Sequence, residues 1–76
     1  MPQFNYIVDD EPQATSSHEL SAKQILENAG IDPASHYLVQ IEGDHRVSYQ
    51  NDPDKLIHMH EHMKFISVST GPTPVS

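Results

Sequence analysis

The stretch Leu20–Asp32, LSAKQILENAGID, encodes one short helix with a recognisable signal at each end. Ser21 is a typical N-cap, and Gln24 three residues later completes a capping box, in which each side chain binds the other residue's backbone N–H. Gly30 follows the last turn, where a residue with positive φ commonly ends a helix. The pattern therefore predicts a helix over Ala22–Ala29.

One side of this helix is apolar. Ile25, Leu26 and Ala29 lie close together at helical spacing and form the expected buried stripe. Leu20, just before the N-cap, and Ile25 occupy the two positions of a hydrophobic staple. Pro33 prevents the helix from resuming. No second helix with such end signals can be written in this chain.

Extended segments flank the helix on both sides. Five of them have the alternation or the β-branched and aromatic content of strands, and they are Gln3–Val8, Gln13–Ser17, Tyr37–Glu42, Arg46–Gln50 and Lys64–Thr70. The second has little apolar content and is expected at a sheet edge. Turn residues separate the strands, and Pro53 is suited to open a single helical turn through Leu56 and Ile57.

The order of these elements predicts an α+β fold of the β-grasp type, ββαβββ, with a mixed sheet and one crossing helix. The helix connects the second and third strands across the sheet, which makes the first and last strands parallel central neighbours. Residues 1–70 are expected to form this single domain. Residues 71–76 contain two prolines and are expected to be a flexible tail.

Size and composition favour a protein that other molecules recognise. A domain of 76 residues buries only about 60% of its unfolded surface, which leaves little interior for a deep catalytic pocket. The chain has no cysteine, so disulfides, zinc ribbons and thiol nucleophiles are excluded. It has neither an apolar run of about 18 residues nor a signal-peptide pattern. We therefore expect a non-enzymatic cytoplasmic protein without a cofactor or a membrane span.

The net charge is −7, from eleven acidic and four basic residues. This balance argues against nucleic acid, because phosphates are bound by Lys and Arg. It suits a basic groove on a partner protein, and simple solubility is the alternative explanation.

The chain resembles the prokaryotic multiubiquitin family of ubiquitin-like domains. The similarity runs from Phe4 to Val68 and consists of the opening FNYIVDD, the helical LSAKQILENAGIDP, the strand YLVQIEG and the closing IHMHEHMKFISV. It implies a β-grasp modifier whose C-terminus is activated by an E1-like enzyme and transferred to a target protein via an E2-like enzyme. It also implies a JAB-type peptidase as a partner. The chain departs from ubiquitin because it lacks a terminal Gly-Gly, a difference that also counts against a sulfur carrier.

The C-terminal segment provides the first candidate site. A peptidase could cut after Gly71 and remove Pro72–Ser76, which would make Gly71 the conjugated residue, since glycine fits a narrow enzyme channel. Alternatively, Ser76 is itself the reactive end, or the segment is an ordinary frayed terminus.

A sheet face provides the second candidate site. Leu38, Gln40 and Glu42 alternate with Tyr37, Val39 and Ile41 along the third strand. The predicted partner-binding surface consists of Leu38, Gln40 and Glu42 together with Phe65 on the last strand. In the alternative, Phe65 packs under Leu56 and Ile57 as part of the core. An interaction module of the same fold that is never conjugated remains the second functional hypothesis.

Two further clusters have simpler explanations. His58, His60 and His62 alternate and could offer imidazoles to zinc or nickel, but a solvated histidine-rich loop explains the run more simply. The acid pairs Asp9-Asp10 and Asp52/Asp54 lie in turns. Acid–base catalysis requires a shielded site, so their expected role is turn formation.

Overall fold

A computed structural model describes residues 3–70 of the chain. Its elements, in chain order, are β1 (Phe4–Val8), β2 (Glu11–Thr15), β3 (Glu19–Ser21), α1 (Ala22–Asn28), β4 (His36–Glu42), β5 (His45–Ser48), β6 (Leu56–His58) and β7 (Met63–Ser69). Five strands form a mixed sheet in the order β2-β1-β7-β4-β5, and β3 pairs with β6 in a separate sheet. The described residues therefore form an α+β domain, compatible with a β-grasp.

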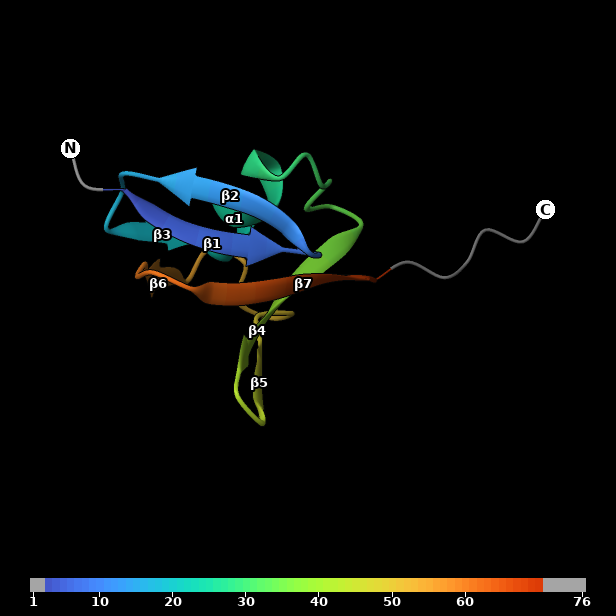
Figure 1. The fold of residues 1–76 in the computed structure, drawn as a ribbon. Coiled ribbons are helices and arrows are strands. Elements are labelled where there is room, and N and C mark those ends of the chain that lie inside the picture. The colour runs from blue at the N-terminus through green and yellow to red at the C-terminus, as the bar shows by residue number, and fades with distance from the viewer. Residues whose placement is uncertain (1–2, 71–76) are drawn as a thin grey trace.

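The first and last strands are the parallel pair that the element order predicts. Tyr6 pairs with Met63 and Val8 with Phe65, so β1 and β7 lie side by side near the middle of the sheet (Figure 1). On its other side β7 pairs antiparallel with β4 along almost its whole length. The strand that precedes the C-terminal segment is thus held on both sides.

The N-terminus of α1 is capped as the sequence predicts. The Ser21 hydroxyl accepts from the backbone N–H of Gln24 at 3.1 Å, and the Gln24 side chain accepts from the backbone N–H of Ser21 at 3.0 Å. Two of the N–H groups that a helix start leaves without a partner are thereby satisfied.

The C-terminus of α1 is a Schellman motif. Gly30 has a φ of 79°, its N–H donates to the Glu27 carbonyl at 3.0 Å, and the N–H of Ile31 donates to the Leu26 carbonyl at 2.9 Å. The helix ends one residue earlier than predicted, with Ala29 as the C-cap. Within the described residues no helix is both long and apolar enough to cross a membrane.

The β1–β2 hairpin turns more tightly than predicted. Val8 pairs with Glu11, so only Asp9 and Asp10 form the loop, and their φ angles of 51° and 68° indicate a type I′ turn. Strand β2 therefore begins at Glu11, two residues earlier than expected, and includes Pro12. Proline is tolerated there because β2 is an edge strand.

The predicted helical turn through Leu56 and Ile57 is wrong. Leu56–His58 is strand β6, and its Ile57 pairs with Leu20 in β3. Both side chains are buried, at 5% and 6% exposure. Neither short segment could bury its apolar side chain alone, but pairing β3 with β6 buries both Ile57 and Leu20. This burial outweighs the local preference of Pro53 for opening a helical turn.

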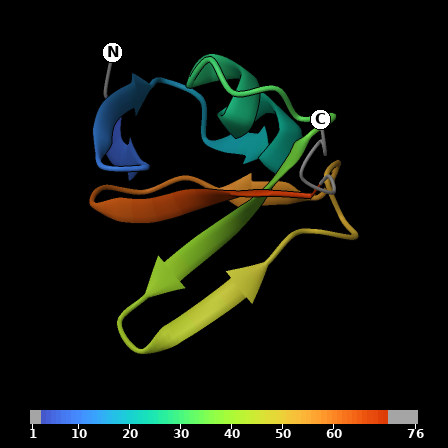
Figure 2. The same cartoon turned by 90° about the vertical axis from the view of Figure 1, so that its right-hand side faces the viewer.

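Helix α1 covers one face of the main sheet, and the β4–β5 hairpin extends away from the rest of the body (Figures 1 and 2). The core lies between the helix and the sheet. Its largest fully buried side chains are those of Tyr6, Val8, Ile25, Leu26, Leu38 and Phe65. The rings of Tyr6 and Phe65 pack edge to face, with centroids 5.9 Å apart.

Candidate protein-docking face of the sheet

The strand register decides which residues face the helix. Gln40 pairs with Phe65, and Leu38 pairs with Ser67, which places these residues on the covered face of the sheet. Leu38 and Phe65 are 0% exposed and Gln40 is 8% exposed. The prediction that these three residues form an exposed surface is therefore wrong, and only Glu42 of the predicted set is exposed. The alternative is confirmed in part, because Phe65 belongs to the same core cluster as Ile57, whereas Leu56 is 58% exposed and lies outside it.

A hydrogen bond makes the burial of Gln40 possible. The Tyr49 hydroxyl donates to Gln40 Oε1 at 3.2 Å. Among the described residues, no buried side-chain nitrogen or oxygen lacks a partner, so the buried amide does not carry the usual penalty. Burial raises the pKa of the Tyr49 phenol, and the negative charge of Glu42 adds to this increase.

The opposite face of the sheet is apolar and lacks a covering helix within the described residues. We call it the outer face. Its apolar, aromatic and basic members on β1, β4, β5 and β7 are Ile7, Tyr37, Val39, Ile41, Arg46, Lys64, Ile66 and Val68, and Asn5, Pro12, Ala14 and Ser48 lie on the same face. Val39 is 8% exposed and yet lies outside the cluster of core residues under the helix. Ile7 is 38% exposed, and Ile41, Ile66 and Val68 are half-buried by their neighbours on this face.

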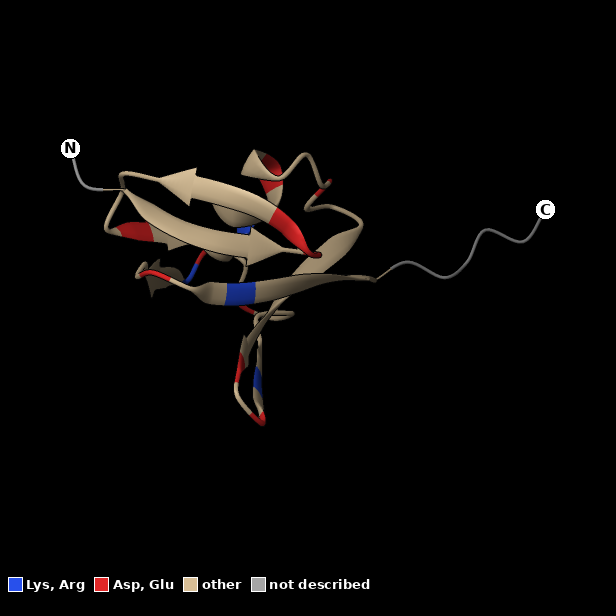
Figure 3. Ribbon diagram, viewed as in Figure 1, with Lys and Arg blue, Asp and Glu red and all other residues tan. Residues whose placement is uncertain are grey.

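The charges of the outer face are the reverse of those of the whole chain. Ile7 pairs with Lys64, Lys64 with Ile41, and Ile41 with Arg46, so apolar and basic side chains alternate in one row across four strands. Two of the chain's four basic residues thus lie on this face, whereas none of its strand residues between positions 3 and 70 is acidic; the Glu61 carboxylate lies at its border, against the Asn5 side chain. Figure 3 shows the basic segment of β7, with acidic residues mostly at turns and strand ends.

This composition makes the outer face a candidate docking surface for another protein. An apolar patch bordered by charge is typical of protein–protein contact sites. The positive charges of Lys64 and Arg46 would attract a partner surface that combines apolar and acidic side chains.

The alternating histidines His58, His60 and His62 are not grouped as potential metal ligands within residues 3–70. Among residues 3–70, no group of three or more His, Cys, Asp or Glu side chains is placed to hold a metal ion. His58 ends β6 and lies 3.6 Å from the Glu19 carboxylate, whereas His62 occupies a turn with a φ of 65°. The carboxylate of Glu61 accepts from the Asn5 backbone N–H at 3.0 Å. The alternation in sequence is lost because the chain turns between these residues.

The acidic pairs have structural roles. Asp9 and Asp10 form the β1–β2 turn, as predicted. In the loop after β5, the Asp52 N–H donates to the Tyr49 carbonyl at 3.1 Å and the Lys55 N–H donates to the Asp52 carbonyl at 3.2 Å. All of these aspartates are exposed, so their carboxylates have no shielded site in which to perform acid–base chemistry.

A backbone hydrogen bond fixes the position of Thr70, the residue that precedes the C-terminal segment. The Thr70 N–H donates to the Ser35 carbonyl at 2.8 Å, which fixes the end of β7 beside the start of β4. The candidate conjugation residues Gly71 and Ser76, and the predicted tail to which they belong, lie outside the described residues.

No protein-family model, curated protein or solved structure matches the chain. The outer face and the sequence motifs are therefore the observations that bear on function. Sequence reasoning identified the two alternating sets of side chains on β4 and β7 correctly, but it assigned the wrong set to solvent. Lys64 and Arg46 lie on the same face as Ile41, but the pairing of their strands places them there, and that pairing cannot be read from alternation within one strand.

Proposed function

We propose that the chain is a ubiquitin-like modifier with a β-grasp fold that enzymes and receptors bind through the outer face. An E1-like enzyme activates its C-terminus, and an E2-like enzyme transfers it to a target protein in a bacterial ubiquitination-like pathway. The observation that supports this proposal most is the outer face, an apolar and basic surface on a chain of net charge −7. A small protein without a deep catalytic site uses such a surface for recognition.

The position of β7 also supports the proposal. A modifier needs a rigid body and a terminal segment that an enzyme can grip. β7 is paired with β1 and β4, and the Thr70–Ser35 hydrogen bond anchors its end. The segment that follows is thus attached to a strand that is paired on both sides. Conjugation would use Gly71 after a JAB-type peptidase removes Pro72–Ser76, or Ser76 without that cleavage.

A transfer reaction tests this function. The full chain is incubated with ATP and with E1-like and E2-like enzymes encoded near its gene, and the products are analysed by intact mass and by peptide mapping. The expected product is an adduct in which the carboxyl group of Gly71 or Ser76 forms an amide bond with a target amine. A chain that lacks residues 71–76 is the control and should form no adduct while retaining its circular dichroism spectrum. If no adenylate or adduct forms with any such enzyme pair, the modifier hypothesis is rejected.

The outer face equally favours the second candidate, a β-grasp interaction module that is never conjugated. The two functions differ in the role of residues 71–76. A module of this kind binds its partner with unchanged affinity after residues 71–76 are deleted, whereas a modifier loses its covalent product.

A further inference from the structure

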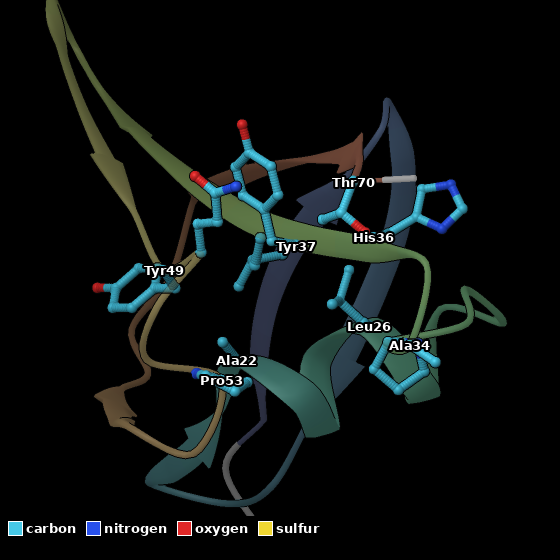
Figure 4. A pocket seen from close by; sticks show the side chains of 11 residues that line it. Ala22, Leu26, Ala34, His36, Tyr37, Tyr49, Pro53 and Thr70 are labelled. Carbon is cyan, nitrogen blue, oxygen red and sulfur yellow. The ribbon is translucent and has the colours of Figure 1, made fainter. Parts of the chain in front are cut away.

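A groove of about 220 Å³ lies between α1, the start of β4 and the loop that follows β5. Figure 4 shows Ala22 and Leu26 of α1 on one wall, and His36 of β4 close to Thr70 at the rim. Pockets for drug-sized molecules are usually about 300–1,000 Å³. This groove is smaller, so it suits a short piece of peptide better than a whole cofactor.

The lining of the groove has the character of a proline-binding surface. It includes Pro33, Tyr49 and Pro53, with Tyr37 at its edge, where the ring lies on the opposite side of β4 from Leu26 (Figure 4), and it contains no Asp, Glu, Lys or Arg side chain. Proline-rich segments in the polyproline II conformation dock into grooves lined by aromatic side chains, because their backbone is already extended before binding. A neutral groove on a strongly acidic chain favours an uncharged ligand.

The chain itself supplies such a ligand next to the groove. Thr70 lines the groove, and the residues that follow it are Gly71-Pro72-Thr73-Pro74-Val75-Ser76, a sequence without any charged side chain. Gly71 has the conformational freedom that a change of direction needs. From Thr70, four extended residues reach at most about 14 Å, so Pro72 and Pro74 begin within range of the groove walls.

We propose that the groove binds the Pro72–Val75 segment of the same chain in a polyproline II conformation. This conformation repeats every three residues, so Pro72 and Val75 share one side and enter the groove, while Thr73 faces away from it. Hydrogen bonding of Thr70 to Ser35 holds the origin of the segment at the rim, which lowers the entropic cost of docking.

Docking has a consequence for activation, and this step rests on the proposed function. Docking of Pro72–Val75 occupies the residues directly after Gly71, so an activating enzyme or peptidase would have to displace the segment before it could act on the C-terminus. The groove would then regulate the availability of the C-terminus.

Nuclear magnetic resonance of the full, uniformly ¹³C/¹⁵N-labelled chain tests the docking directly. The expected result is a set of nuclear Overhauser effects from Pro72 and Val75 to groove side chains, including the Ala34 methyl group. Val75→Asp places a charge in the neutral groove and should abolish these effects. Thr73→Ala, the matched control, should preserve them. Ala34→Glu changes an exposed loop residue of the groove and should also abolish them while the amide shifts of β1 stay unchanged.

Three outcomes would overturn the proposal. The first is random-coil shifts for residues 72–75 without effects to the groove. The second is equal behaviour of Val75→Asp and Thr73→Ala. The third is effects that arise only between labelled and unlabelled chains in a mixed sample, which would place the segment of a second copy in the groove. No enzyme takes part in these measurements, so failure of the docking proposal is distinct from failure of the transfer reaction.

Discussion

Asp9 binds Ser67 through both of its carboxylate oxygens. Oδ1 accepts from the Ser67 backbone N–H at 2.8 Å, and Oδ2 accepts from the Ser67 hydroxyl. The Asp9 N–H also donates to the Phe65 carbonyl at 3.0 Å. The turn residue thereby continues the parallel pairing of β1 with β7 beyond the end of β1, and it joins the first hairpin to the strand that leads to the C-terminal segment.

We expect Asp9→Gly to destabilise the domain by about 1–2 kcal/mol, because it removes hydrogen bonds to a charged group at a partly solvated site. Asp10→Gly is the matched control, since both residues have positive φ and glycine relieves the same backbone strain at each. Urea unfolding measures both. Equal effects of the two substitutions would show that the contact with Ser67 contributes nothing.

The side chains of Tyr49 and Gln40 should contribute to the free energy of unfolding as a coupled pair. Tyr49→Phe leaves the buried Gln40 carbonyl oxygen without its partner and should cost about 1–3 kcal/mol of unfolding free energy, whereas loss of both polar groups is much less costly. The double variant Gln40→Leu/Tyr49→Phe should therefore be more stable than the sum of the two single changes indicates. A double-mutant cycle by urea unfolding measures this, and strict additivity would contradict the account.

Alkaline pH should destabilise the domain through its buried tyrosines. Burial raises the pKa of Tyr6 and of Tyr49 above 10.0, with Asn28 opposing the increase at Tyr6. Above pH 10 the unfolded chain loses these protons and the folded chain keeps them, so the free energy of unfolding falls as pH rises. Below pH 10 this contribution is fully present.

Melting temperatures at pH 9 and pH 11 measure the effect. Tyr6→Phe should reduce the loss between the two pH values, although it also removes a buried hydroxyl at both. Tyr37→Phe, on the outer face, serves as the comparison. A loss of stability that is the same in the wild type and Tyr6→Phe would rule out Tyr6 as its source.

The helix cap should contribute a measurable part of the stability. Ser21→Ala removes the acceptor for the Gln24 N–H and should cost about 1 kcal/mol. Ser16→Ala lies in the exposed loop after β2 and is the control. Chemical denaturation distinguishes the two, and a cost below about 0.3 kcal/mol for Ser21→Ala would mean that the capping box adds little.

Local signals in the sequence predicted local structure well. The Ser21–Gln24 box, the Gly30 terminus and the Asp9-Asp10 turn each depend on chemistry within a few residues, and the structure contains all three. The parallel neighbours β1 and β7 followed from element order, because a crossing helix leaves few compact arrangements.

Long-range choices were harder to predict. Alternation separates Leu38 from Val39, but a sheet with two apolar faces does not reveal which face the helix covers. Gln40 made its own face appear solvated, and only its contact with Tyr49, nine residues away, makes burial favourable. Similarly, the β3–β6 pairing depends on Leu20 meeting Ile57, a contact that no local pattern encodes.

If the outer face binds partner proteins, an acidic substitution on it should weaken binding more than the same substitution at an equally exposed position elsewhere. Ile7 on the outer face and Val47 on the other face are 38% and 39% exposed, so aspartate at either site should disturb folding to a similar extent.

The measurement is the dissociation constant of the complex between the full chain and the E1-like enzyme for the wild type, Ile7→Asp and Val47→Asp. We predict that Ile7→Asp weakens binding at least about tenfold, which corresponds to about 1.4 kcal/mol, and that Val47→Asp leaves it within about twofold. Unchanged binding by Ile7→Asp, or equal weakening by both variants, would contradict the claim.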